Sequence, residues 1–284
     1  TDIPVAEKPV KAVTAPAYDS KKLIVAEGTD PAALMSQGLA ALGGLEQMVK
    51  PGSVVVIKPN FSVPQAPEVA ATTKPALVAA LVKQCLAAGA KEAKVIDHPF
   101  TNGALCLQRT GIKKEVEAAG GRIFVLDKAN DTYYRQVNLG GKVITTALYS
   151  RDVLEADVFI NFPVLKHHNT TQITMGLKNL MGLIWDRGIF HRTDLLQGIA
   201  ELAAFRKPHL TILDATRGIV ENGPMGPGKI KEWNQLVMGA DPLAVDVYGA
   251  TLFGLPPSAL GYLTAAAQLG VGEFDPNKIS VVRV

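Results

Sequence analysis

The sequence contains few cysteines and no long apolar run. Its 284 residues include two cysteines, Cys85 and Cys106, both in segments with helical spacing. Two isolated thiols cannot hold an iron–sulfur cluster or a Cys-based zinc site by themselves, so we expect no intrinsic iron–sulfur cluster. A disulfide between them stays open, although buried free thiols are the commoner arrangement. No apolar stretch reaches the roughly 18 residues that cross a bilayer, so we expect no transmembrane segment.

A strong excess of charge of one sign is also missing. The 29 Lys and Arg residues nearly balance the 26 Asp and Glu residues, and the net charge is +3. The basic residues are spread along the chain, whereas a nucleic-acid-binding protein usually carries a basic cluster or stripe, so we expect no nucleic acid partner. Hydrophobic residues make up 48% and charged residues 19%, which is typical of a folded globular chain.

Several common catalytic motifs are absent. No GxGxxG follows the first apolar run, and the sequence lacks GxSxG and HExxH spacings. These absences disfavour a standard dinucleotide fold, a serine hydrolase elbow and a zinc protease. The Gly/Pro loop at residues 218–228 lacks the Walker lysine pattern and is a weak phosphate signal. His167 and His168 are adjacent and project differently, so at most one is expected to face a given site, and a bound metal stays undetermined.

The first 20 residues differ in composition from the rest. The segment is rich in Pro, Ala, Val and Lys, shows no clear period, and begins with Thr1. It resembles a flexible linker after a cleaved export signal, although a disordered tail of other origin has the same composition. We therefore expect a linker over residues 1–20, one α/β domain over residues 21–284, and an exported location in the periplasm or outside the cell. A cytoplasmic location is the alternative.

The remaining chain alternates apolar strand-like runs with helix-like segments. Val54–Ile57, Val158–Phe162 and Leu210–Leu213 show almost no polar alternation, as parallel strands covered on both faces require. Helical spacing separates them, and residues 131–150 alternate around a Gly-Gly pair, as a hairpin or an antiparallel edge excursion does. The fold class is therefore α/β, with a largely parallel sheet and helices on both faces, built as one large domain or two closely fused lobes.

Polar residues follow the strand-like runs directly. In open parallel sheets ligands bind at the carboxyl ends of strands, where such residues gather. Four strand-like runs, the three above and Val95–Ile96, are followed by polar residues: Lys58 and Asn60; Asp97 and His98; Lys166, His167 and His168; and Asp214. A single polar strand exit usually means only that the chain has reached solvent. The coincidence of four favours a site more than any one of them.

Residues 170–184 are the most informative stretch. As one helix they carry an apolar stripe, with Thr171, Thr174 and Lys178 on an adjacent face and Asn179 beside them. Hydroxyls and an ammonium near a helix amino end suit a carboxylate or phosphate. A solvated helix flank with an extended lysine is the alternative reading.

We expect these residues to form one site, in which each has a role. Lys58, Lys166 and Lys178 are expected to bind an anion, and His167 or Asp97 to transfer protons. The other expected ligand-binding residues are Asn60, Thr174, Asn179 and Asp214. The cofactor stays unknown.

Seven short motifs also resemble the domain of unknown function 362 family. They lie, in order, at Val55–Asn60, Ala71–Pro75, Ile96–Pro99, Pro163–His168, Met175–Leu180, Asn222–Pro224 and Ala240–Asp246. The resemblance marks the family pattern's polar positions as Lys58, Asn60, Asp97, Lys166, His167, Lys178 and Asn179. Relatives of this kind often carry twin-arginine export signals or ferredoxin modules. This sequence has no four-cysteine cluster motif, so electron transfer through its own cluster is not expected.

Three functions remain open. The first is an enzyme, or the remnant of one, acting on a small anionic substrate. The second is a non-catalytic accessory or cofactor-binding protein of an exported redox system, with a redox partner protein, and the third is an interaction scaffold. A pocket in which Lys58, Lys166 and Lys178 converge favours the first two, whereas dispersed lysines beside a broad apolar patch favour the third.

Overall fold

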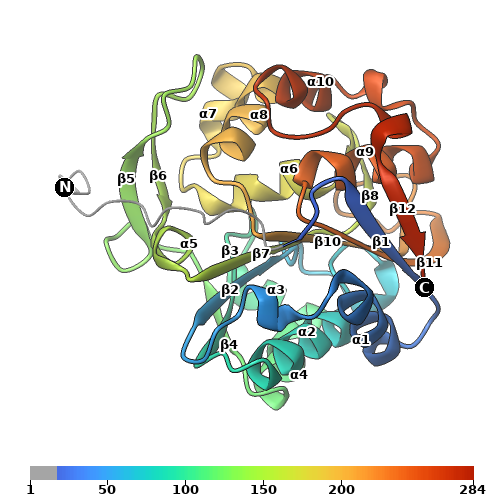
Figure 1. The fold of residues 1–284 in the computed structure, drawn as a ribbon. Coiled ribbons are helices and arrows are strands. Elements are labelled where there is room, and N and C mark those ends of the chain that lie inside the picture. Colours follow the sequence, from blue (N-terminus) through green and yellow to red (C-terminus); the bar gives the residue numbers. More distant parts are fainter. Residues whose placement is uncertain (1–17) are drawn as a thin grey trace.

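The computed structural model describes residues 18–284, and all but the last three residues of the expected 1–20 linker lie outside that range. Its centre is an eight-stranded sheet (Figure 1). From one edge to the other the strands are β12 (Ser280–Arg283), β1 (Lys22–Glu27), β11 (Ile230–Gly239), β10 (Leu210–Ile219), β7 (Val158–Phe162), β2 (Val54–Pro59), β3 (Glu92–Asp97) and β4 (Arg122–Val125).

Most neighbouring strands run parallel, which confirms the predicted fold class. The pairs β12–β1, β10–β7, β7–β2, β2–β3 and β3–β4 are parallel, whereas β11 is antiparallel to both of its neighbours. The apolar runs identified in the sequence form β7 and begin β2 and β10. Parallel pairing places the carboxyl ends of β2, β3 and β7 at the same edge of the sheet.

Alternate strand residues enter two separate apolar layers. In β2, Val55 and Ile57 pack in one buried cluster, and Val56 packs in the other. The first layer is covered by α1 (Pro31–Leu42), α2 (Pro75–Ala87), α3 (Gly103–Thr110) and α4 (Ile112–Ala118). The second is covered by α5 (Arg151–Glu155), α6 (Gly176–Asn179), α7 (Gly188–Arg192), α8 (Leu195–Phe205), α9 (Pro242–Phe253) and α10 (Gly261–Gln268) (Figure 1). Burial on both faces explains why these strands lack polar alternation.

Short elements complete the fold. The predicted hairpin within residues 131–150 is present as β5 (Tyr134–Asn138) and β6 (Thr146–Ser150), which pair antiparallel. The single-turn helices are η1 (Leu45–Gln47), η2 (Pro67–Val69), η3 (Leu180–Leu183), η4 (Pro257–Ala259) and η5 (Pro276–Lys278). Within residues 18–284 no helix has the length and hydropathy to cross a membrane.

The prediction of one helix over residues 170–184 is wrong. The segment contains the strand β9 (Gln172–Thr174), then α6, then η3. Strand β9 pairs antiparallel with β8 (Lys166–His168), and Lys166 lies directly opposite Thr174. The β-branched residues Thr171, Ile173 and Thr174 favour this extended conformation over a helix. The predicted shared helix face of Thr171, Thr174 and Lys178 therefore does not exist.

Candidate functional site

A cavity of about 420 Å³ opens at the carboxyl edge of β2 and β3. Its walls also come from the β8–β9 pair, from α6 and η3, and from the loop between β10 and β11. Seven predicted site residues line it: Lys58, Asn60, Asp97, Lys166, Thr174, Lys178 and Asn179. The structure therefore brings the three predicted lysines to one cavity.

Two predicted site residues do not line this cavity. The His167 ring lies outside it, and its Nδ1 accepts a hydrogen bond of 3.0 Å from the Gly223 backbone N–H. Asp214 is buried in β10, where its carboxylate accepts hydrogen bonds from the Lys74 backbone N–H and from Thr216. Asp214 thereby anchors the chain entering α2 and stabilises the strand around it.

The residues Lys58, Asp97, Asn161 and Asn179 form a closed polar group, called here the Lys58–Asp97 cluster. The Lys58 ammonium donates to Asp97 Oδ1 at 2.7 Å, to Asn179 Oδ1 at 3.1 Å and to the Pro59 carbonyl at 2.9 Å. All three of its N–H bonds therefore have oxygen acceptors. Burial lowers the pKa of Lys58, and the adjacent Asp97 opposes that shift.

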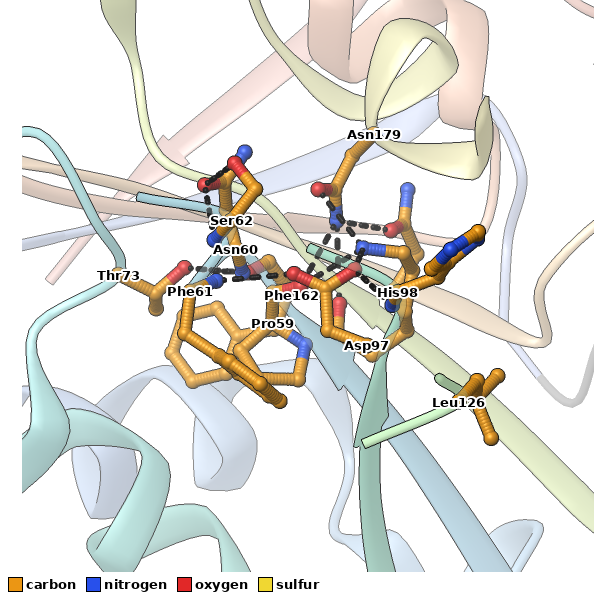
Figure 2. Close-up of polar contacts among 12 residues, drawn as sticks. Pro59, Asn60, Phe61, Ser62, Thr73, Asp97, His98, Leu126, Phe162 and Asn179 are labelled. Atoms are coloured by element: carbon orange, nitrogen blue, oxygen red, sulfur yellow. Dashed lines mark hydrogen bonds and ion pairs between the residues drawn. The ribbon is translucent and has the colours of Figure 1, made fainter. Parts of the chain in front are cut away.

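Asp97 and Asn179 are equally well satisfied. Asp97 also accepts from the backbone N–H groups of His98 at 2.9 Å and Phe61 at 3.0 Å, as Figure 2 shows. Asn179 donates to Asn161 Oδ1 at 2.9 Å and to the Lys58 carbonyl at 3.1 Å. The backbone of η3 lies close above this group, because a Cβ added to Gly182 would lie 2.5 Å from Asp97 Oδ1.

The second group on the cavity wall consists of Lys166, Thr174, Lys178 and Arg187, called here the Lys166–Lys178 cluster. Lys166 donates only to two backbone carbonyls, of Ala71 at 2.6 Å and of Pro224 at 2.9 Å. Lys178 has no oxygen acceptor among residues 18–284, and its nearest polar partner is the Met181 sulfur at 3.6 Å. Neither lysine nor Arg187 has a carboxylate within ion-pair distance in the described part of the chain.

Burial and repulsion between cations lower the pKa of both lysines in this cluster. Desolvation, with the charge of Lys178 next, lowers the pKa of Lys166 to about 7. Desolvation and the charge of Arg187 lower the pKa of Lys178 to about 8. Both effects penalise an ammonium that has no neutralising partner.

A buried hydroxyl without a partner lies on the same wall. Thr174 is 4% exposed, and its Oγ1 has no hydrogen-bond partner among the residues that the structure describes. Buried hydroxyls are rarely left in this state, since each loses its hydrogen bonds to water without replacement. Thr174 lies opposite Lys166 in the β8–β9 pair, so both side chains project from the same face.

The Gly/Pro-rich loop between β10 and β11 closes one side of the cavity. A Cβ added to Gly223 would lie 1.8 Å from the His167 carbonyl oxygen, so only glycine allows the loop to approach β8 this closely. This approach places the Pro224 carbonyl against Lys166 and places Pro224 and Met225 on the cavity wall.

Several cavity residues were not predicted from the sequence. His168 lines the cavity where His167 does not, because alternate residues of a strand share a face and Lys166 already faces the cavity. That alternation was the signal that could have identified His168. Arg187 lies between η3 and α7, and no strand exit or helical pattern points to it. The remaining unpredicted lining residues are Ser62, Phe100, Asn169, Thr170, Met181, Gly182, His191, Leu195, Pro224 and Met225.

Burial lowers the pKa of His168 to about 3, with a further contribution from the charge of Lys178. Its Nδ1 accepts a hydrogen bond from the Thr170 backbone N–H at 3.1 Å, so the neutral ring carries its proton on Nε2. Among residues 18–284 no three His, Cys, Asp or Glu side chains are grouped to hold a metal ion. Cys85 and Cys106 are buried free thiols.

The sequence is similar to that of known proteins. Residues 55–251 match the family model described as "Domain of unknown function (DUF362)". The chain is 29% identical over 249 residues to thylakoid-associated protein sll1697 of Synechocystis sp. (strain ATCC 27184 / PCC 6803 / Kazusa), and the match covers 82% of this chain and 73% of that protein.

A solved structure has a similar fold. The lactate racemase apoprotein from Thermoanaerobacterium thermosaccharolyticum superimposes with a TM-score of 0.51 at 13% sequence identity. The superposition covers 91% of this chain and 62% of the racemase, so this chain spans less than two thirds of that protein's length. At this identity the likeness establishes the α/β fold alone.

Proposed function

The chain belongs to the DUF362 family, and we propose that it binds a small organic carboxylate in the cavity lined by Lys58, Lys166 and Lys178. One observation carries the proposal. Lys166, Lys178 and Arg187 face the same cavity, and the only acidic residue on the described cavity wall, Asp97, is committed to Lys58. A bound anion supplies the missing negative charge.

The pKa values of the two lysines support an anionic ligand. Burial and neighbouring cations lower the pKa of Lys166 to about 7 and that of Lys178 to about 8. An anion nearby favours the charged form of a lysine and offsets both causes. Anion binding is therefore coupled to proton uptake by these amines.

The unpartnered Thr174 hydroxyl supports the same class of ligand. A hydroxyl donates one hydrogen bond, and a carboxylate accepts up to four. Thr174 Oγ1 has no partner within the described chain, whereas the Asn179 and Asn161 amides nearby are already occupied. A carboxylate beside Lys166 gives this hydroxyl its acceptor.

The solved neighbour supports the choice of a carboxylate over a phosphate. That protein is a lactate racemase apoprotein, and lactate is a small carboxylate. The fold alone is shared, so the neighbour supports a carboxylate only by analogy. The unneutralised cations of the cavity carry the proposal for this chain.

Thermal unfolding in the presence of anions tests this function. The probes are L-lactate, pyruvate and inorganic phosphate, with sodium chloride at matched ionic strength. A carboxylate at ten times its Kd raises the free energy of unfolding by about 1.4 kcal/mol through mass action. We expect this stabilisation in the wild type and a clearly smaller one in Lys178→Met, which keeps Lys166 and Arg187.

Lys83→Met is the matched control, since Lys83 is exposed on α2 and lies outside the cavity. It is expected to respond to carboxylates as the wild type does. Equal stabilisation of Lys178→Met and the wild type, or stabilisation by phosphate alone, contradicts the proposal.

A further inference from the structure

The three cavity lysines differ in how many oxygen atoms accept from them. Lys58 has three acceptors, Lys166 has two, and Lys178 has none within residues 18–284. An ammonium carries three N–H bonds, whereas a neutral amine carries two and a lone pair. The site thus holds Lys58 as a cation and gives Lys178 no oxygen that favours its charged form.

Lys178 is also placed where a ligand can reach it. It lines the cavity from α6, and its side chain is only partly covered, whereas Lys58 and Lys166 are each 1% exposed. In the cavity without ligand, desolvation and Arg187 lower its pKa to about 8, so the neutral amine is much more populated at pH 7 than in an ordinary lysine. An ordinary exposed lysine is neutral in only about one molecule in 2,500 at that pH.

We propose that Lys178 is a nucleophile that forms an imine with the carbonyl carbon of a 2-oxo acid whose carboxylate lies against Lys166 and Arg187. The proposal rests on the carboxylate-binding function above and adds a covalent step to it. The amine lone pair attacks the carbonyl carbon and forms the C–N bond. The carbonyl oxygen takes up a proton and the nitrogen loses one, which gives a carbinolamine.

Loss of water then completes the imine. The carbinolamine hydroxyl leaves as water with one proton, and the nitrogen lone pair forms the C=N bond. The net reaction is amine plus ketone to imine plus water, so no oxidant or reductant is required. His168 lines the cavity, and the Nε2–H of its neutral ring is the proposed hydrogen-bond donor to this oxygen.

The uncharged part of the wall indicates what the rest of the ligand is like. Phe100, Met181, Leu195 and Met225 line the cavity, and Phe100 and Met225 are 49% and 40% exposed. Apolar side chains that border a cationic wall suit an amphipathic ligand. The proposed substrate is therefore a 2-oxo acid with an apolar tail, which places its carboxylate on the cations and its tail along these residues.

Borohydride trapping tests the covalent step. The full chain is incubated with pyruvate or 2-oxohexanoate and sodium cyanoborohydride, which reduces an imine to a stable secondary amine. Peptide mass spectrometry then locates the adduct. We expect the adduct at Lys178 to form at least about tenfold faster than at the exposed Lys83, because the bound carboxylate holds the carbonyl carbon beside the Lys178 amine.

Two variants separate nucleophilic from electrostatic roles. Lys178→Met removes the amine, and Lys178→Arg keeps a cation that forms no imine. We expect both to lose the adduct, and Lys178→Arg to keep the thermal stabilisation by L-lactate, which has no ketone. Rapid adduct formation in either variant at another cavity lysine overturns the assignment.

The two experiments distinguish failure of the imine proposal from failure of the carboxylate-binding proposal. Stabilisation by 2-oxohexanoate without an adduct at Lys178 overturns the imine and leaves carboxylate binding intact. Absence of both overturns the proposed function as well. Trapping at a fixed low concentration is expected to favour 2-oxohexanoate over pyruvate by roughly fourfold for each methylene that becomes buried, and an equal rate for both overturns the apolar tail.

Discussion

The cavity wall has two polar groups, which differ in whether their charges are paired. In the Lys58–Asp97 cluster every N–H of the ammonium has an oxygen acceptor, and both carboxylate oxygens accept hydrogen bonds. In the Lys166–Lys178 cluster no carboxylate neutralises the two lysines or Arg187, and a buried hydroxyl has no partner in the described chain. The first group is complete without a ligand, and the second is not. Removing one partner of a satisfied buried pair destabilises the fold, whereas an unsatisfied charge is tolerated where a ligand completes it.

The largest expected effect comes from breaking the complete group. Lys58→Met leaves the buried Asp97 without its cation and removes the donor to Asn179. We expect the free energy of unfolding to fall by about 3–5 kcal/mol in chemical denaturation, the usual consequence of removing one partner of a buried pair. The double variant Lys58→Met/Asp97→Leu removes both charges and is expected to lose less. A change within about 0.5 kcal/mol for Lys58→Met would falsify the structural role of this pair.

A smaller loss of stability is expected when Gly182, whose backbone packs on the Lys58–Asp97 pair, is replaced by alanine. A Cβ added to Gly182 would lie 2.5 Å from Asp97 Oδ1 and 2.8 Å from Lys58 Cε. Gly182→Ala therefore forces η3 or the ion pair to shift, and we expect a cost of about 1–3 kcal/mol. The measurement is the midpoint of chemical denaturation, at an unchanged dependence of the unfolding free energy on denaturant concentration. An unchanged midpoint shows that the backbone does not pack on this pair as closely as described.

In the Lys166–Lys178 cluster, removing a charge is not expected to lower the free energy of unfolding. Lys178→Met replaces a desolvated cation with an apolar side chain of similar length, beside Met181 and with no oxygen partner to lose. We expect the free energy of unfolding without ligand to stay the same or rise by about 1 kcal/mol. Chemical denaturation in an anion-poor buffer checks this. A loss as large as that of Lys58→Met removes the distinction between the two groups.

The smallest effect is a pH dependence at Lys178. Its pKa in the folded protein, lowered to about 8 by burial and Arg187, is below the value of about 10.4 in the unfolded chain. Between these values the unfolded chain binds more protons, so the wild type gains stability with rising pH. We expect any stability advantage of Lys178→Met at pH 7 to shrink by pH 10. An advantage independent of pH contradicts the lowered pKa.

Much of the fold followed from the sequence because its signals are local. Buried strands read as unbroken apolar runs, and their exits place Lys58 and Lys166 at one edge of a parallel sheet. Lys178 was expected in the site through a helix that does not exist, and it arrives there instead through the turn from β9 into α6. Its sequence distance from Lys166 is short, so either path keeps the two residues near each other.

The sequence did not show which charged side chains have all their hydrogen-bond partners. Asp97 and Lys58 belong to different strands, and only the register of β2 beside β3 brings them together. Arg187 enters the cavity from a turn without a periodic pattern. Whether a lysine has three acceptors or none depends on carbonyls such as those of Ala71 and Pro224, which lie far from Lys166 along the chain. The distinction between the two polar groups is therefore a tertiary property.

The most direct test of the account is the number of protons taken up when a carboxylate binds. Titration calorimetry with L-lactate at pH 8, in buffers of different ionisation enthalpy, measures this number. Lys166 and Lys178, with pKa values lowered to about 7 and about 8, are largely or partly neutral there, and an anion raises both values. We predict net proton uptake by the wild type and by Lys83→Met, and reduced uptake in Lys178→Met. Binding without proton uptake, or no binding at all, contradicts the conclusion that unneutralised lysines in this cavity form an anion site.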